Sequence, residues 1–132
     1  MTFIVGNVSS PVEIAGVHGG RASIRWKRFA TGNMLYSDLD SFEWAQIPAD
    51  GAIGTHVHSR TEEIYFIVRG TGRMEVDGEL TEVGPGDLIL TPLHSQHSFQ
   101  PTGGEPVEII VCEMLPPVIL DRLPSHSPSV KD

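Results

Sequence analysis

The segment GTHVHSRTEEIYFIVRG, residues 54–70, decides how the rest of the sequence is interpreted. It places two histidines one residue apart, then two glutamates, and then a run of β-branched and aromatic residues typical of a strand. Residues i and i+2 of a strand point to the same face, so His56 and His58 are expected to project together. If the short polar link SRTE returns the chain into a neighbouring antiparallel strand, Glu63 comes round to face both histidines.

Imidazole nitrogens and a carboxylate oxygen suit Zn, Fe, Mn, Ni or Cu, so this segment predicts part of a site for one divalent transition metal ion. A fourth ligand is expected in PGDLILTPLHSQHSF, residues 85–99, where one strand ends before Pro92 and another begins near His97. His94 and His97 compete for this role. They are three residues apart, but a turn between them removes the rule that would put them on opposite faces.

Short strands are predicted along most of the chain, and segments with helical periodicity are hard to find. The Asp77-Gly78 pair predicts a two-residue type I′ hairpin turn. Many short strands without crossover helices predict an all-β, antiparallel sandwich or barrel with little helix. The strands are expected at residues 12–17, 22–29, 33–36, 41–47, 54–58, 63–69, 73–76, 79–83, 87–91, 96–100 and 107–114.

The segment that holds the two histidines resembles the first of the two motifs of the cupin superfamily. His56 and His58 are followed by four residues, then Glu63, then six residues, then Gly70. The leading glycine of this motif, which spans residues 51–70, is displaced by one position to Gly51, or is replaced by Asp50.

The second cupin motif is matched at residues 86–101. Gly86 is followed by five residues, then Pro92, and His97 stands at the histidine position of the motif. His94 stands where the family has glycine, and Pro101 stands where it has asparagine. Neither departure removes a ligand.

The resemblance implies a jelly-roll barrel, a double-stranded β-helix, and it selects the metal ligands. By resemblance the ligands are His56, His58, Glu63 and His97. Glu62 remains an alternative to Glu63, because the family tolerates a spacer of three residues. We expect the barrel domain to span residues 1–115, and residues 116–132 to form a partly disordered C-terminal extension.

His94 and Tyr65 are the candidate catalytic residues. An imidazole titrates near neutral pH, so His94 could move a proton for a metal-bound substrate. Tyr65 follows Glu63 at strand period and is expected to share its inward face. Ordinary core packing is the alternative for Tyr65, and a surface turn is the alternative for His94.

We expect an enzyme that oxygenates, isomerises or cyclises a small oxygen-bearing organic molecule, with dioxygenases, isomerases and polyketide cyclases as the implied classes. The alternatives are a non-catalytic, metal-dependent sensor or ligand-binding cupin, and a subunit whose barrel only mediates assembly. The resemblance also implies a homodimer, paired through the N-terminal strands.

The composition argues against two classes of partner. The formal net charge is -8 with only nine lysines and arginines, which disfavours nucleic acid and anionic membrane surfaces. No segment approaches the roughly 18 continuous apolar residues of a membrane span. We therefore expect a cytoplasmic protein whose partner is a small molecule.

Overall fold

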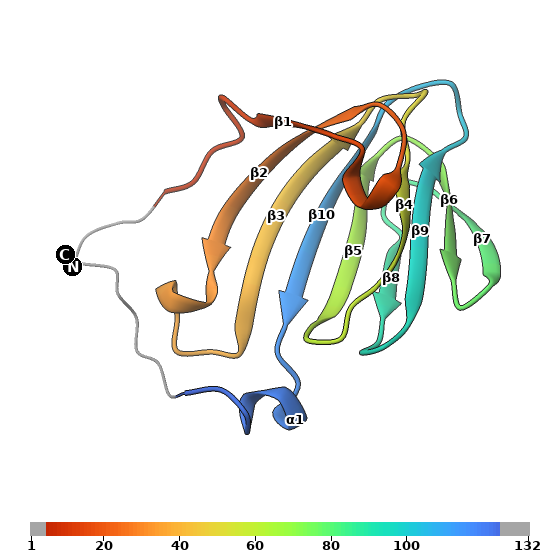
Figure 1. Ribbon diagram of the computed structural model, residues 1–132. Helices are drawn as coiled ribbons and strands as arrows, with labels where there is room; N and C mark the ends of the chain where they lie inside the picture. The colour runs from red at the N-terminus through yellow and green to blue at the C-terminus, as the bar shows by residue number, and fades with distance from the viewer. Residues whose placement is uncertain (1–4, 125–132) are drawn as a thin grey trace.

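Two antiparallel β-sheets face each other in this protein (Figure 1). The structure is a computed structural model, and it describes residues 5–124. The larger sheet has six strands in the order β1-β2-β3-β10-β5-β8. These strands are β1 (Val12–Ala15), β2 (Ser23–Thr31), β3 (Leu39–Ile47), β10 (Val107–Met114), β5 (Glu62–Arg69) and β8 (Leu88–Thr91).

The smaller sheet has four strands in the order β4-β9-β6-β7. They are β4 (Ile53–Val57), β9 (Gln96–Pro101), β6 (Gly72–Val76) and β7 (Glu79–Val83). Within residues 5–124 the helical structure is limited to single turns, namely η1 (Val17–Gly19), η2 (Gly32–Met34) and α1 (Pro117–Leu120). This is the antiparallel jelly roll that the sequence predicted. None of the described helices has the length and apolar character that a membrane crossing requires.

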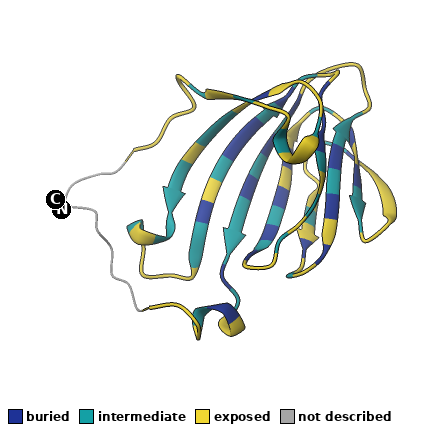
Figure 2. Cartoon of the chain, viewed as in Figure 1, coloured by how far each residue is buried: buried dark blue, intermediate teal, exposed yellow. Residues whose placement is uncertain are grey.

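The core lies between the two sheets because alternate residues of each strand point inward. In β5 the buried residues are Glu63, Tyr65 and Ile67, and their neighbours are more exposed. In β10 the same period buries Val107, Ile109 and Val111, and Figure 2 shows this alternation as dark blue bands. Each buried aliphatic side chain stabilises the fold by about 1.5–3 kcal/mol.

The Asp77-Gly78 turn confirms the predicted hairpin between β6 and β7. Asp77 has φ 50° and Gly78 has φ 84°, the two positive values that a type I′ turn needs. The turn sets a regular antiparallel register in which Val76 pairs with Glu79.

One predicted strand, residues 33–36, is wrong. Asn33 and Met34 belong to η2, and residues 35–38 are bends. The strands on either side, β2 and β3, pair with each other, so the connecting residues have to turn back tightly. Gly32 permits this turn, because a Cβ at this position would lie 2.7 Å from the Leu39 carbonyl oxygen.

The SRTE link also runs differently from the expectation. β4 and β5 are not neighbours: β4 pairs with β9, and β5 pairs with β10 and β8. The link therefore crosses from the smaller sheet to the larger one. Glu63 faces the histidines across the interior of the sandwich, and not from an adjacent strand.

The C-terminal segment begins with a helical turn. α1 follows β10, and its Ile119 is buried. Residues 125–132, in which disorder was predicted, lie outside the described residues. The division of the chain at residue 115 stays a prediction.

Candidate metal centre

Three histidines project inward from the smaller sheet. His56 on β4 lies directly opposite His97 on β9 in the antiparallel register, and their ring centroids are 4.1 Å apart. His58 follows the last residue of β4, and its ring centroid lies 4.8 Å from that of His56. The His94 N–H donates to the His58 carbonyl oxygen at 2.9 Å, which ties the two motifs together at this end of the barrel.

Glu63 reaches the histidines from the opposite sheet. Its Oε1 lies 2.6 Å from His58 Nε2, and its Oε2 lies 3.2 Å from His97 Nε2. One donor atom from each of His56, His58, Glu63 and His97 lies within 4.8 Å of the others. The four residues that the sequence selected therefore meet at one point between the sheets.

The orientation of these donor atoms fits a bound cation. His58 Nε2, Glu63 Oε2 and both ring nitrogens of His97 are buried without a hydrogen-bond partner among residues 5–124. Buried polar atoms are nearly always hydrogen-bonded, so four orphaned atoms in one cluster require an explanation. A metal ion between these side chains would satisfy His58 Nε2, Glu63 Oε2 and one ring nitrogen of His97, since the two nitrogens of one imidazole cannot bind the same ion.

The second nitrogen of His56 is held by the backbone. Nδ1 lies 2.8 Å from the Gly54 carbonyl oxygen and donates to it, so Nε2 is left to enter the cluster. Such contacts fix the tautomer and the ring orientation of metal-binding histidines.

Burial and neighbouring charge set the protonation of the cluster. Burial alone would raise the pKa of the Glu63 carboxyl, but the adjacent His58 and His97 hold that pKa well below its usual range. Burial lowers the pKa of His56 to about 4. At neutral pH His56 is therefore a neutral imidazole and Glu63 is a carboxylate, which are the forms that bind metals.

Three imidazoles and one carboxylate are compatible with Fe, Mn, Zn, Ni or Cu. The identity of the metal depends on its availability and on fine geometry more than on ligand type. Four protein ligands leave up to two positions of a six-coordinate ion for other molecules.

The family comparison agrees with this geometry. The cupin domain family matches residues 43–113, which is more than half of the chain and includes all four ligands. The chain belongs to the cupin family.

Known relatives of this cupin include proteins with and without an assigned ligand. An uncharacterised protein of Methanocaldococcus jannaschii is 36% identical over 84 residues, which cover 64% of this cupin and 67% of the relative. The oxalate-binding protein of Thermotoga maritima is 24% identical over 106 residues, which cover 80% of this cupin and 88% of the relative. A crystal structure of a predicted oxalate decarboxylase from Thermotoga maritima has a TM-score of 0.80 and 24% identity, covering 85% of this cupin and 99% of that chain. The structural likeness establishes the fold.

A cavity of about 80 Å³ in this cupin is lined by three of the four candidate ligands, His56, His58 and Glu63. Polar groups enter it from both sheets and from η1. Most of its walls are apolar, and they are formed by Val17, Ile24, Trp26, Ala45, Ile53, Tyr65, Ile109 and Val111.

The structure separates the two candidate catalytic residues. Tyr65 lines the cavity, is 4% exposed, and its ring centroid lies 5.7 Å from that of His97. Burial and the nearby Glu63 raise the pKa of the Tyr65 hydroxyl, so it remains protonated at neutral pH. His94 has an exposed side chain in a turn with φ 69°, and it is not among the residues that line the cavity. Both catalytic roles stay predictions.

The alternative ligand, Glu62, points elsewhere. Its Oε2 accepts a hydrogen bond of 3.4 Å from the Leu93 N–H, and it is not part of the donor cluster. The one-residue step along β5 puts neighbouring side chains on opposite faces, and this explains why Glu63 and not Glu62 faces the histidines.

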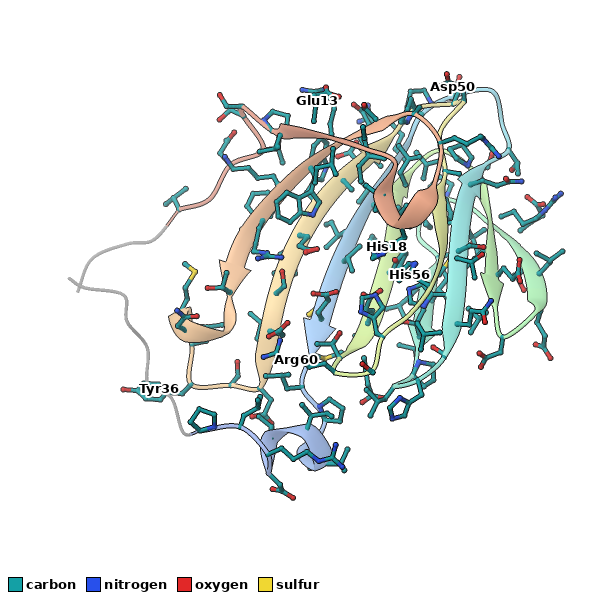
Figure 3. The ribbon with its side chains drawn as sticks, viewed as in Figure 1. Glu13, His18, Tyr36, Asp50, His56 and Arg60 are labelled. Atoms are coloured by element: carbon teal, nitrogen blue, oxygen red, sulfur yellow. The ribbon has the colours of Figure 1, made fainter. Side chains whose placement is uncertain are left out.

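His18 is a site residue that the sequence reasoning missed. Its ring stacks on His56 with centroids 3.6 Å apart and an interplanar angle of 9°. Figure 3 shows the two rings side by side where η1 passes over β4. The signal available in the sequence was a histidine among glycines, in GVHGG at residues 16–20. It precedes the region that carries the cupin motifs.

Glu113 is a second residue that the sequence reasoning missed. It lies opposite Glu63 in the register of β10 and β5, and both side chains face the cavity. Burial, together with a hydrogen bond to Glu63, raises the pKa of Glu113 to about 9. The signal available in the sequence was the alternation of inward and outward residues along VEIIVCEM. Val107, Ile109 and Val111 point inward, and Glu113 is the next residue of this series.

Close backbone contact holds η1 against β4, and it yields a stability prediction for Gly54→Ala. A Cβ at Gly54 would lie 2.0 Å from the His18 carbonyl oxygen, so the turn would have to move. We expect this variant to lose about 1–3 kcal/mol of unfolding free energy, the usual cost of forcing extra atoms into a packed site. Urea denaturation of the metal-free protein measures this loss of unfolding free energy.

Gly84→Ala is the matched control for this prediction. A Cβ at Gly84 would meet only the Thr71 methyl carbon, at an ordinary 3.6 Å. We expect a change within about 0.5 kcal/mol, as for most surface substitutions. Equal stability of the two variants would show that the contact between η1 and β4 is not tight.

Proposed function

We propose that this cupin is a mononuclear metal-dependent enzyme that acts on a small oxygen-bearing organic acid. The observation that carries the proposal is the convergence of four protein donors on one point inside the barrel, beside a mostly apolar cavity. Such a site excludes bulk water and leaves coordination positions for a substrate oxygen.

The size of the cavity supports a substrate of a few heavy atoms. Pockets for drug-sized ligands measure about 300–1,000 Å³, whereas this cavity is about 80 Å³. A water molecule takes up about 30 Å³ in the liquid, so a dicarboxylate of the size of oxalate is a better match than a polyketide. The name of the Thermotoga maritima relative, an oxalate-binding protein, supports the same class of ligand.

The residues of this chain would have distinct roles in that chemistry. His56, His58, Glu63 and His97 would hold the ion, which when bound would act as a Lewis acid on a substrate oxygen or, with a redox metal, support oxygenation. The buried Tyr65 hydroxyl stands beside Glu63 and is the side chain best placed to hold a proton at the substrate. Oxygenation or isomerisation of a small acid is the reaction class that we propose.

The second candidate is a non-catalytic protein that binds the same class of ligand through the metal. The name of the oxalate-binding relative favours it, since that name describes binding and no reaction.

Binding and turnover measured on the same samples separate the two candidates. Oxalate and related small acids would be titrated calorimetrically into protein loaded with Fe(II), Mn(II) or Co(II), and into metal-free protein. We expect metal-dependent binding, with product formation or O₂ consumption if the protein is an enzyme. Binding without turnover for any metal would favour the second candidate. Equal binding with and without metal would contradict both.

We also propose that two copies of the chain form a homodimer, through a surface other than the N-terminal strands that the resemblance implies. The outer face of the larger sheet carries an exposed apolar group on its neighbouring strands β5 and β8, where side chains are 38–61% exposed. An exposed apolar patch of this kind is typical of interaction sites. The group consists of Phe66, Val68, Leu88 and Leu90.

Leu90→Lys tests this surface against a control of equal exposure. Leu90 is 61% exposed on the larger sheet, and Leu80 is 60% exposed on the smaller one. We expect sedimentation to give twice the mass of one chain for the parent protein and for Leu80→Lys, and a shift toward one chain for Leu90→Lys. A monomeric parent protein, or a dimer that Leu90→Lys leaves intact, would contradict this surface.

A further inference from the structure

We propose that His18, on the turn η1, contacts the bound small acid and donates a hydrogen bond from its ring to a carboxylate oxygen. The inference rests on the proposed function, which supplies the ligand class. It adds a specificity-determining residue that lies outside the two cupin motifs and outside the region that the cupin family matches.

The backbone holds His18 in a fixed and unusual position. Its φ of 51° is left-handed, a conformation that non-glycine residues rarely adopt. Reciprocal hydrogen bonds join Arg21 and Ala52, at 3.1 Å and 3.0 Å, and they anchor the turn to the start of β4. Gly20 and Gly54 permit this approach, because a Cβ at Gly20 would lie 1.9 Å from the Ala52 carbonyl oxygen. Residues held in sparsely populated backbone conformations cluster at ligand sites.

The ring of His18 lies at the edge of the cavity and close to the ligands. It stacks on His56, and its centroid lies 6.1 Å from that of His58 in an edge-on orientation. His18 lines the same cavity as the metal ligands, yet the residue is exposed to solvent. It therefore stands where a ligand would enter and where the part of the ligand remote from the metal would lie.

The chemistry of the cavity leaves a role for a donor at this place. Beyond the candidate metal ligands, the polar side chains that face the inner part of the cavity are Tyr65, Glu43 and Glu113, and none of them is a cation. A dicarboxylate that used some oxygens on the metal would need donors for the others. His18 has a ring N–H, and among residues 5–124 no hydrogen bond of its side chain is found.

A purely structural role is the alternative, in which the ring only supports His56 by stacking. Two substitutions separate the roles. His18→Phe keeps an aromatic ring and removes the nitrogens, whereas His18→Asn keeps an N–H donor and removes the ring. Asn also tolerates the left-handed backbone conformation, so this variant is expected to fold.

The test measures metal and acid separately. Co(II) binding would be followed by its visible absorption spectrum, and oxalate binding to the Co(II)-loaded protein would be measured by calorimetry. We expect both variants to bind one Co(II) with an unchanged spectrum. His18→Phe should weaken oxalate binding about 10–100-fold, the usual cost of losing a hydrogen bond to a charged group, and His18→Asn should restore most of the affinity.

Three results would overturn the inference. Parental oxalate affinity in His18→Phe would show that the nitrogens make no contact. Loss of Co(II) and oxalate in His18→Asn, with both retained in His18→Phe, would show that the ring only supports His56 by stacking. A parent protein that binds Co(II) but no oxalate would reject the contact while the metal site stands. Failure of the proposed function would instead appear as a parent protein that binds no Co(II).

Discussion

Protein purified without added metal is expected to contain close to one divalent transition metal ion per chain, and the His56→Ala/His97→Ala variant close to none. These two residues face each other across β4 and β9 and supply half of the four donors. Loss of a residue that merely orients a ligand already costs about 10–100-fold in metal affinity. The loss of two ligands should cost more, so the effect is visible in simple elemental analysis.

His94→Ala is the control for this measurement. His94 is an exposed histidine of the same second motif, and its side chain is not part of the donor cluster. We expect its metal content to match that of the parent protein. Equal metal in the parent protein and the double variant would contradict the assignment of the site, whatever the control shows.

Glu113→Gln is expected to stabilise the metal-free protein, and the gain is expected to grow as the pH rises from 5 to 8. The pKa of Glu113 is raised to about 9 by burial and by its hydrogen bond to Glu63, whereas a carboxyl in the unfolded chain titrates near pH 4.3. The folded protein therefore retains a proton that the unfolded chain releases. Its stability falls as the pH rises between these two pKa values.

Glutamine carries no titrating proton and avoids this loss. At pH 5 we expect the two proteins to agree within about 0.5 kcal/mol, because a protonated carboxyl and an amide are similar in shape. At pH 8 we expect Glu113→Gln to be more stable by about 1–3 kcal/mol. This is less than the full pKa difference implies, because the side chain is 16% exposed.

Urea denaturation in the presence of a chelator measures the difference, with Glu79→Gln as the control. Glu79 is exposed on the β6–β7 hairpin and is not among the residues that line the cavity. We expect its pH profile to follow that of the parent protein. A pH-independent difference between Glu113→Gln and the parent protein would show that Glu113 does not retain a proton on folding.

Much of the fold could be predicted because strand period and turn chemistry act locally. The positive φ values of the Asp77-Gly78 turn follow from the residue types alone. The inward faces of β5 and β10 follow from the alternation of side chains between the two faces of a strand. The strand predicted at residues 33–36 failed because its apolar residues connect two strands that pair with each other. Leu35 and Tyr36 remain 49% and 81% exposed, so apolar character did not signal burial there.

The meeting of the four candidate ligands could be predicted because each motif fixes a local spacing, and the jelly roll brings the two motifs together. His18 and Glu113 were missed for a different reason. Each reaches the site through tertiary contacts, η1 against β4 and β10 beside β5, and neither has a spacing to the ligands that a sequence pattern can use. His94 shows the converse, since its place in a motif did not bring its side chain to the cavity.

Anomalous X-ray scattering from crystals of metal-loaded protein, recorded on both sides of the absorption edge of the metal, tests the central claim most directly. We expect a single peak per chain between His56, His58, Glu63 and His97, within bonding distance of one atom of each. A peak elsewhere on the chain, or no peak from protein that retains its metal in solution, would contradict the account.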